Sequence, residues 1–344
     1  MDNPAPTSLD ETLSPPWLTE ALSARYPGVR VTGSAETWRQ DNVATKVRFK
    51  IDVEPMSNPP PSRWCVKGYW GKPDRYAGGD HEGRFYSTLA ETLPIQVPPC
   101  DYTGTDPATG HTLILMHDLT ADGSTFLTAL SPYTVDLAAA TLDQLALLHA
   151  SRWRDQTLDG VPWLAPRISA FPDYIPPDVL QSLLDGQRGD PLPASIKDAT
   201  RLGAAMRRLG ASTDGKPLSL IHGDAHAGNI YLRADGSVGI IDWQVVHQGT
   251  WACDVAYHIG AVLSVDDREK AERDLLAHYL DRLGTYGGEP PSWDEAWAEY
   301  RNFLVYGYFL WAMTRYVDEQ ITLEFVKRLG TAVAQHESFE ALRV

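Results

Sequence analysis

The chain has 344 residues, of which 43% are hydrophobic and 22% are charged, so it can bury a large core and is long enough for two domains. Its net charge of −15 argues against nucleic acid or an anionic membrane as the main partner, because both attract basic surfaces. Three scattered cysteines fit no disulfide or zinc pattern, and no stretch is apolar for long enough to cross a membrane. A cytoplasmic protein is expected.

In the first third of the chain, strand patterns surround one helix. A loose leader is expected over 1–15, followed by a short helix over 18–26. Strict alternation of apolar and polar residues predicts a strand over 45–53. Asp80 is expected to cap a helix over 81–93. Further strands are expected over 29–32, 63–69, 100–104 and 111–116.

Beyond residue 117 the pattern becomes helical. Helices are predicted over 134–153, 194–209, 251–264, 267–283 and 293–316, and strands only within 218–242. This change of pattern predicts a domain of residues 16–117, which is a small, mostly antiparallel sheet with one helix, and a larger helical domain of residues 118–344.

The most informative segment is a predicted hairpin of two short strands that flank Ala234-Asp-Gly-Ser237. Centring a two-residue turn on Asp235 and Gly236 places residue 230 opposite 241, and Asn229 opposite Asp242. An amide and a carboxylate would then lie side by side, close to Asp224 in the preceding loop. Oxygen ligands of this kind suit Mg²⁺, and a further Asp can orient a hydroxyl nucleophile, so the segment predicts a phosphoryl-transfer site. The competing interpretation is a polar turn; the apolar flanking strands, which place these groups near buried structure, weigh against it.

A second candidate pair lies upstream. Lys67 projects from a strand that otherwise reads as core, and Glu82 follows on the next helix. Such a pair can hold the α- and β-phosphates of a nucleotide. The alternative is a surface lysine and an unrelated Glu that the helix dipole favours.

Other polar residues near Asp224 have structural explanations. A transition-metal site on His222, Asp224 and His226 would make the chain a metal-dependent hydrolase, but the histidines lack the usual helical spacing. His222 is expected to brace the loop by a hydrogen bond. Asp254, in an apolar helix, is expected to bond the backbone of the same loop. Helical spacing of the many aromatic residues in the second half indicates core packing for most of them.

These motifs resemble the aminoglycoside phosphotransferase-like kinase superfamily, and its ecdysteroid kinase-like branch in particular. The resemblance rests on His222-Gly-Asp-Ala-His-Ala-Gly-Asn229, Ile241-Asp-Trp-Gln244, Asp254-Val-Ala-Tyr257, Lys67, Glu82-Gly-Arg-Phe-Tyr86 and Leu145-Ala-Leu-Leu-His149. It covers roughly residues 30–320. It implies an α+β, two-lobed protein-kinase-like fold, with a small antiparallel-sheet N-lobe and a larger, mainly helical C-lobe.

By motif position, the resemblance implies ATP, with GTP as an alternative, and Mg²⁺. Asp224 would be the catalytic aspartate, Asn229 and Asp242 the magnesium ligands, and Lys67 with Glu82 the phosphate-binding pair. The base would contact the linker between the lobes, near Met116 and Leu119. The segment 33–44 contains one glycine and therefore no glycine-rich phosphate loop, so Ser34, Asn42 or backbone groups would cover the phosphates.

The sequence therefore predicts an ATP-dependent phosphotransferase that acts on a hydroxyl of a small molecule. The acceptor and the oligomeric state are not specified; the aromatic C-terminal half favours a more apolar alcohol over an aminoglycoside. Two alternatives stay open. One is a catalytically silent kinase-like sensor, which the presence of all the polar groups argues against and the missing glycine loop keeps open; the other is the metal-dependent hydrolase.

Overall fold

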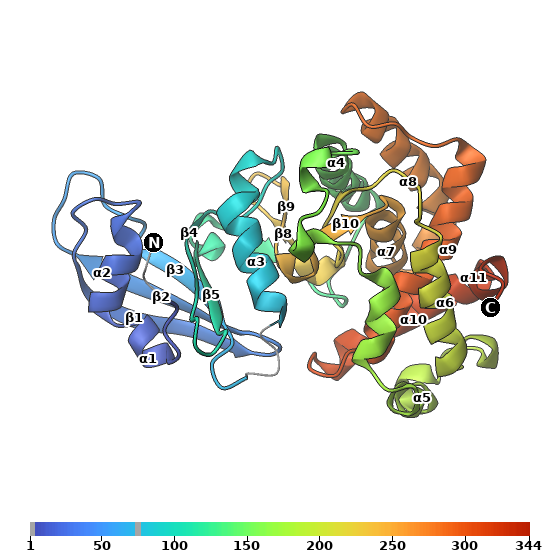
Figure 1. Cartoon of the computed structure of the whole chain (residues 1–344), viewed down its shortest axis with the longest axis horizontal. Coiled ribbons are helices and arrows are strands. Elements are labelled where there is room, and N and C mark those ends of the chain that lie inside the picture. Colours follow the sequence, from blue (N-terminus) through green and yellow to red (C-terminus); the bar gives the residue numbers. More distant parts are fainter. Residues whose placement is uncertain (1–3, 73–76) are drawn as a thin grey trace.

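The protein is described by a computed structural model that covers residues 4–72 and 77–344. Figure 1 shows two lobes, a sheet-containing N-lobe and a larger helical C-lobe. The predicted fold class, α+β with two protein-kinase-like lobes, is confirmed.

The N-lobe is built on one antiparallel sheet with the strand order β1-β2-β3-β5-β4. The strands are β1 (Val31–Asp41), β2 (Thr45–Val53), β3 (Arg63–Gly68), β4 (Cys100–Thr105) and β5 (Thr112–His117). The alternation that predicted β2 reflects its burial, because Val47, Phe49 and Ile51 face a core while Lys50 and Asp52 are exposed. Helices α1 (Leu9–Thr12) and α2 (Pro15–Ser23) complete this core, with Trp17 and Leu18 buried against the sheet.

Helix α3 (Ala77–Thr88) lies between the sheet and the C-lobe in Figure 1. The ring of Phe85 on α3 stacks on that of Trp243 with centroids 3.9 Å apart. Phe85 thus belongs to the large core that continues through the C-lobe. The prediction that Asp80 caps this helix was wrong, since the helix begins three residues earlier and the Asp80 carboxylate pairs with Arg84 at 2.8 Å.

The C-lobe packs its helices around α7 (Ala252–Val262), every residue of which is buried. The other helices are α4 (Val135–Ser151), α5 (Pro177–Asp185), α6 (Ala199–Ala211), α8 (Val265–Thr285), α9 (Trp293–Met313), α10 (Glu319–Gln335) and α11 (Ser338–Ala341). Helices α5, α10 and α11 were not predicted. In the described residues, no helix is both long and apolar enough to cross a membrane.

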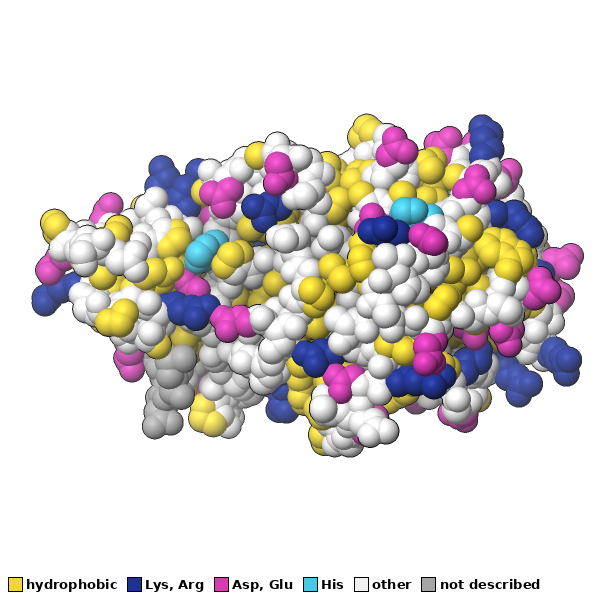
Figure 2. All heavy atoms as spheres, turned by 90° about the horizontal axis from the view of Figure 1, so that it is seen from above, with side chains coloured by type: hydrophobic (Ala, Val, Ile, Leu, Met, Phe, Trp, Pro, Cys, Tyr) yellow, Lys and Arg dark blue, Asp and Glu magenta, His cyan; other side chains and the backbone are white. Residues whose placement is uncertain are grey.

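Short strands in the C-lobe form two small sheets. β7 (Ser219–Ile221) pairs with β10 (His247–Gly249), and β8 (Ile230–Leu232) lies between β6 (Thr125–Phe126) and β9 (Val238–Ile240). Strands therefore extend beyond 218–242, contrary to the prediction. On the face shown in Figure 2, acidic and basic side chains are interspersed over both lobes.

The β8–β9 hairpin exists, but its predicted register was wrong by one residue. Ile230 pairs with Ile240 and Leu232 with Val238. The amide of Gly236 donates to the Arg233 carbonyl, and Gly236 has a φ of +82°. The loop therefore has three residues, which is the arrangement in which a type I turn is followed by a left-handed glycine. Asn229 consequently lies opposite Ile241, whose amide donates to the Asn229 carbonyl at 2.9 Å.

Candidate functional site

The carboxylate of Asp224 is held by three neighbouring side chains. The Tyr257 hydroxyl donates to Oδ1 at 2.9 Å, and the Asn229 amide nitrogen donates to Oδ2 at 3.0 Å. Nε2 of His226 lies 3.5 Å from Oδ2. Burial alone raises the pKa of this carboxyl, but the neighbouring His226 and His222 together outweigh burial, so the pKa of Asp224 is lowered. Asp224 is therefore ionised and fixed in orientation at neutral pH.

The loop that carries Asp224 is anchored from beneath by Asp254 on α7. The carboxylate of Asp254 accepts the backbone N–H groups of His222 and Gly223, both at 2.7 Å, and it contacts Nε2 of His149 at 3.1 Å. His222 braces the same loop, since Nε2 bonds the Ile241 carbonyl at 2.9 Å and Nδ1 accepts the Asp224 amide at 3.1 Å. The supporting roles predicted for Asp254 and His222 match these contacts.

The same contacts remove the basis for the metal-dependent hydrolase. Both ring nitrogens of His222 are engaged by backbone groups, so neither has a lone pair free for a metal. Across residues 4–72 and 77–344, no cluster of three or more His, Cys, Asp or Glu side chains is arranged to hold a metal ion.

Lys67 on β3 forms the centre of a buried group of charges. Its ammonium nitrogen lies 2.6 Å from Glu82 Oε2 on α3 and 2.8 Å from Asp242 Oδ1. Burial by itself lowers the pKa of Lys67, but the two carboxylates outweigh burial and raise it. Burial raises the pKa of the Asp242 carboxyl, yet Lys67 and Lys46 outweigh this effect and lower it. The lysine and Asp242 are therefore both charged, and the pair joins the two lobes.

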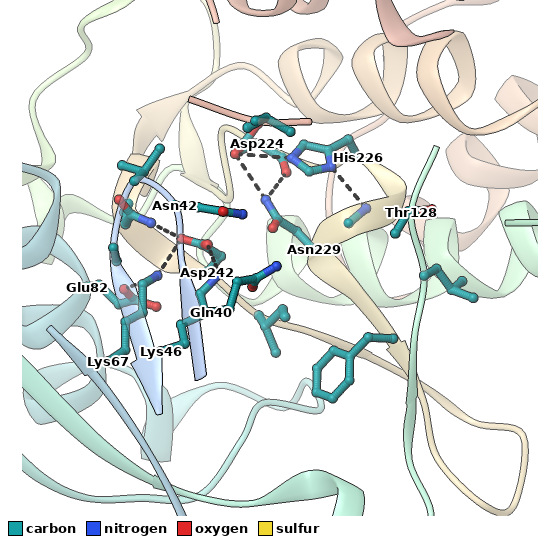
Figure 3. Close-up of a pocket in the computed structure, with 18 of the residues that line it drawn as sticks. Gln40, Asn42, Lys46, Lys67, Glu82, Thr128, Asp224, His226, Asn229 and Asp242 are labelled. Atoms are coloured by element: carbon teal, nitrogen blue, oxygen red, sulfur yellow. Dashed lines mark hydrogen bonds and ion pairs between the residues drawn. The ribbon is translucent and has the colours of Figure 1, made fainter. Parts of the chain in front are cut away.

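Asp242 reaches this position through an unusual backbone conformation. With φ 67° and ψ 67° it is one of four non-glycine residues of positive φ in the described parts of the chain. Asp and Asn adopt this region more readily than most side chains. Asn229 and Asp242 both line the cavity, and Figure 3 shows them between Asp224 on one side and Lys67 with Glu82 on the other.

The donor set at Asn229 and Asp242 fits a hard cation. The amide nitrogen of Asn229 is committed to Asp224, to its backbone oxygen at 2.8 Å and to its carboxylate, so the amide oxygen remains as a ligand. One carboxylate and one amide oxygen, with further positions left for phosphate oxygens and water, match the way proteins bind Mg²⁺ with nucleotides.

A cavity of about 470 Å³ connects these groups. Asn42, Met116 and Leu119 line it, as do Lys67 and Glu82. Ser34 does not join them. It pairs with Ile51 near the opposite end of the β1–β2 hairpin from Asn42, and its hydroxyl donates to the Leu13 carbonyl.

Several residues of the site were not predicted. Lys46 lies 3.6 Å from Asp242, and it lines the cavity together with Gln40. The sequence could have indicated that Tyr257 contacts the loop of Asp224. Asp254 and Tyr257 are three residues apart and so share one face of α7. No sequence signal indicated the apolar cavity-lining residues at the end of α9 and on α10, because α10 was not predicted.

Comparisons with known proteins identify the family and the fold of the chain. The model of the phosphotransferase enzyme family matches residues 67–301. A search of curated proteins found no match. Among solved structures, an ethanolamine kinase from Plasmodium vivax matches with 12% identity and a TM-score of 0.55, over 87% of this chain and 81% of its own. A choline kinase from Streptococcus pneumoniae matches with 15% identity and a TM-score of 0.51, over 92% and 98% of the two chains.

A GDP and kanamycin complex of an aminoglycoside phosphotransferase has 12% identity and a TM-score of 0.51, with 94% and 98% covered. At these identities the structures show a shared fold, whereas the family model covers most of the sequence. The chain therefore belongs to the phosphotransferase enzyme family and is a small-molecule phosphotransferase with a protein-kinase-like fold.

Proposed function

We propose that the chain transfers the γ-phosphate of ATP to a hydroxyl group of a small molecule, with Asp224 as the catalytic aspartate. The observation that carries this proposal is that Asp224 of the C-lobe and the Lys67–Glu82–Asp242 group, which joins the two lobes, line one cavity. Asp224 would accept the hydroxyl proton while the acceptor oxygen bonds to the γ-phosphorus. The bond from that phosphorus to the bridging oxygen would break, and ADP would leave.

We propose 16–117 and 118–344 as the two functional domains. The nucleotide would be bound mainly by residues of the first, the N-lobe. Lys67, positioned by Glu82, would contact the phosphates, and Asn42 would cover them from the β1–β2 hairpin. Met116 and Leu119 would border the base. A direct comparison of the two nucleotides would decide whether ATP or GTP is preferred.

Asn229 and Asp242 would hold Mg²⁺, which neutralises charge on the transferred phosphoryl group when it is bound. The protein's own contribution is positioning: Tyr257 and Asn229 fix the Asp224 carboxylate before an acceptor arrives. A cytoplasmic location and membership of the ecdysteroid kinase-like branch remain predictions. The three cysteines are free thiols, which a reducing compartment maintains.

Two variants separate the proposed roles. Asp224→Ala should abolish transfer and leave Mg·ATP binding within about threefold, because this carboxylate does not contact Lys67. Asp242→Asn keeps the left-handed backbone conformation but removes the charge, and should weaken Mg·ATP binding at least tenfold. The measurements are calorimetric titration of ATP with and without Mg²⁺, and acceptor-dependent ADP release across a library of alcohols.

The sensor alternative predicts that Mg·ATP binds and that no alcohol stimulates ADP release. Transfer by Asp224→Ala at the parent rate would contradict the role assigned to Asp224.

A further inference from the structure

The part of the cavity beside Asp224 is bounded by an apolar wall. Its residues come from the end of α9, the start of α10 and the segment between them: Leu310, Trp311, Thr314, Val317, Ile321 and Phe325. This set is called the α9–α10 wall below.

Packing of His226 places the α9–α10 wall at the Asp224 end of the cavity. The imidazole of His226 lies 3.5 Å from Asp224, and its ring packs edge-on against Trp311 and Phe325 at centroid distances of 5.0 and 5.1 Å. Tyr257, which donates to Asp224, also lines the cavity. A molecule whose hydroxyl meets Asp224 therefore lays its remaining atoms against this wall.

The α9–α10 wall carries no charge. Its polar groups are both neutral: the hydroxyl of Thr314, which already donates to the Leu310 carbonyl at 2.7 Å, and the buried indole N–H of Trp311. Among the described cavity-lining residues of the C-lobe, the acidic side chains are Asp118, Asp224 and Asp242. Arg63 pairs with Asp118 at 2.9 Å, and Lys67 and Lys46 neutralise Asp242. With the acceptor hydroxyl at Asp224, an ammonium group elsewhere on the acceptor would lose its hydration against the wall without a further unpaired carboxylate to compensate, which is costly.

Aromatic rings could bind a cation through their faces, but the rings of the wall are largely committed to one another. Trp311 and Phe325 stack with centroids 4.2 Å apart and planes 28° apart, and both are almost fully buried. Half-buried aliphatic side chains, Leu310, Val317 and Ile321, complete the lining. Such a surface gains free energy by covering apolar atoms.

We propose that the acceptor is an uncharged alcohol with a largely apolar body, which rests its hydroxyl at Asp224 and its carbon skeleton on the α9–α10 wall. This inference deepens the proposed phosphotransfer and rests on it for the identity of the reacting group.

A matched pair of alcohols tests the proposal. Octan-1-ol and 8-aminooctan-1-ol share a chain length and a hydroxyl, but the second carries a positive charge at pH 7. Calorimetric titration should show octan-1-ol binding at least tenfold more tightly. Equal or tighter binding of the amino alcohol would overturn the proposal, and this comparison needs no variant.

Placing a carboxylate in the wall should reverse the preference. Ile321 is half-buried, so Ile321→Glu can fold with its carboxylate at the cavity; it should weaken octan-1-ol binding at least tenfold and strengthen binding of 8-aminooctan-1-ol. The control is Val135→Glu, which makes a comparable change at a 37% exposed position at the start of α4 and should alter neither affinity. Unchanged octan-1-ol affinity in Ile321→Glu would contradict the proposal.

Titration with Mg·ATP separates this inference from the phosphotransferase proposal. A protein that prefers octan-1-ol but does not bind Mg·ATP would refute the proposed reaction and retain the neutral pocket. A protein that binds Mg·ATP and phosphorylates 8-aminooctan-1-ol in preference to octan-1-ol would refute the neutral pocket and retain the reaction.

Discussion

Replacing Lys67 by Met tests the buried charge group most directly. Lys67 and Glu82 are each about 3% exposed at their side chains, and Asp242 is 15% exposed. Methionine fills a similar volume without a charge, so Lys67→Met leaves two carboxylates facing a cavity without their shared cation.

The expected loss of stability follows from the geometry. At an effective dielectric constant of about 20, ion pairs at 2.6 and 2.8 Å are each worth about 6 kcal/mol of Coulomb attraction. Desolvation of the three groups offsets much of this, and removing one partner of a buried pair typically costs about 3–5 kcal/mol. For 344 residues the unfolding entropy is about 0.7 kcal/mol/K, so the thermal midpoint should fall by about 4–7 °C.

Thermal unfolding followed by circular dichroism, without nucleotide and at one scan rate, measures this shift. Lys46→Met is the matched control: its ammonium lies 3.6 Å from Asp242 with the side chain 31% exposed, and such a pair is worth about 0–1 kcal/mol. The double variant Lys67→Met/Glu82→Gln should recover part of the loss, because one unpaired carboxylate is removed. The reasoning is refuted if Lys67→Met lowers the midpoint no more than Lys46→Met does.

Three further predictions concern the loop that carries Asp224 and the residues that support it. Tyr257→Phe removes a hydrogen bond to a carboxylate worth about 1.5–3 kcal/mol, so basal ATP hydrolysis should fall about tenfold or more. The acid limb of its pH profile should move to higher pH, because the pKa of Asp224 rises. An unshifted pH profile would contradict this. Burial lowers the pKa of His258 to about 4, so its neutral form stabilises the fold above about pH 6.5 and this contribution is lost as the pH falls towards 4. From pH 7 to pH 5, urea unfolding should show the parent losing about 2 kcal/mol relative to His258→Gln, and parallel losses would contradict the account. Gly223 has a φ of +79° and a Cβ there would lie 2.5 Å from a backbone oxygen, whereas Gly236 has a φ of +82° and open space around it. Gly223→Ala should therefore lower the free energy of unfolding by about 3 kcal/mol, and Gly236→Ala by about 1 kcal/mol. Equal urea midpoints for the two variants would refute the steric argument.

Strands that bury one face could be predicted from the sequence, and strands at an edge could not. Thr45–Val53 was predicted with its observed bounds because β2 lies between two strands and alternates between core and exterior. β1 was predicted as 29–32 but runs over Val31–Asp41. From Glu36 onwards its residues are exposed on the sheet edge, so its sequence shows no alternation, and its pairing with β2 determines the strand instead.

The hairpin register shows how a local ambiguity can be offset elsewhere. Asp235-Gly236 suits a two-residue turn, but it also suits a three-residue loop with a left-handed glycine, and the sequence does not distinguish them. A shift of one residue normally turns a side chain to the other face of a strand. β9 ends at Ile240, and the positive φ of Asp242 redirects the chain, so Asn229 and Asp242 line the same cavity although they are not paired.

The residues that carry the motif were easier to find than those that surround it. Asp224, Asn229 and Asp242 lie within one short segment, and Lys67 with Glu82 forms the expected contact. Tyr257 reaches Asp224 from another element, and Trp311 and Phe325 come from helices much later in the chain. The aromatic residues of α9 are mostly core, as expected, so spacing could not single out Trp311 as part of the cavity.

The contact between Lys67 and Asp242 has a consequence for how the proposed magnesium ion would bind. The ammonium group already occupies one oxygen of the carboxylate proposed to bind magnesium, and its raised pKa keeps it protonated throughout the physiological range. Arrival of a divalent ion is thus an exchange of counter-ions rather than a simple addition. The nucleotide phosphates can take over the displaced lysine, so the metal and the nucleotide should enter together, and free Mg²⁺ should bind far more weakly than its ATP complex.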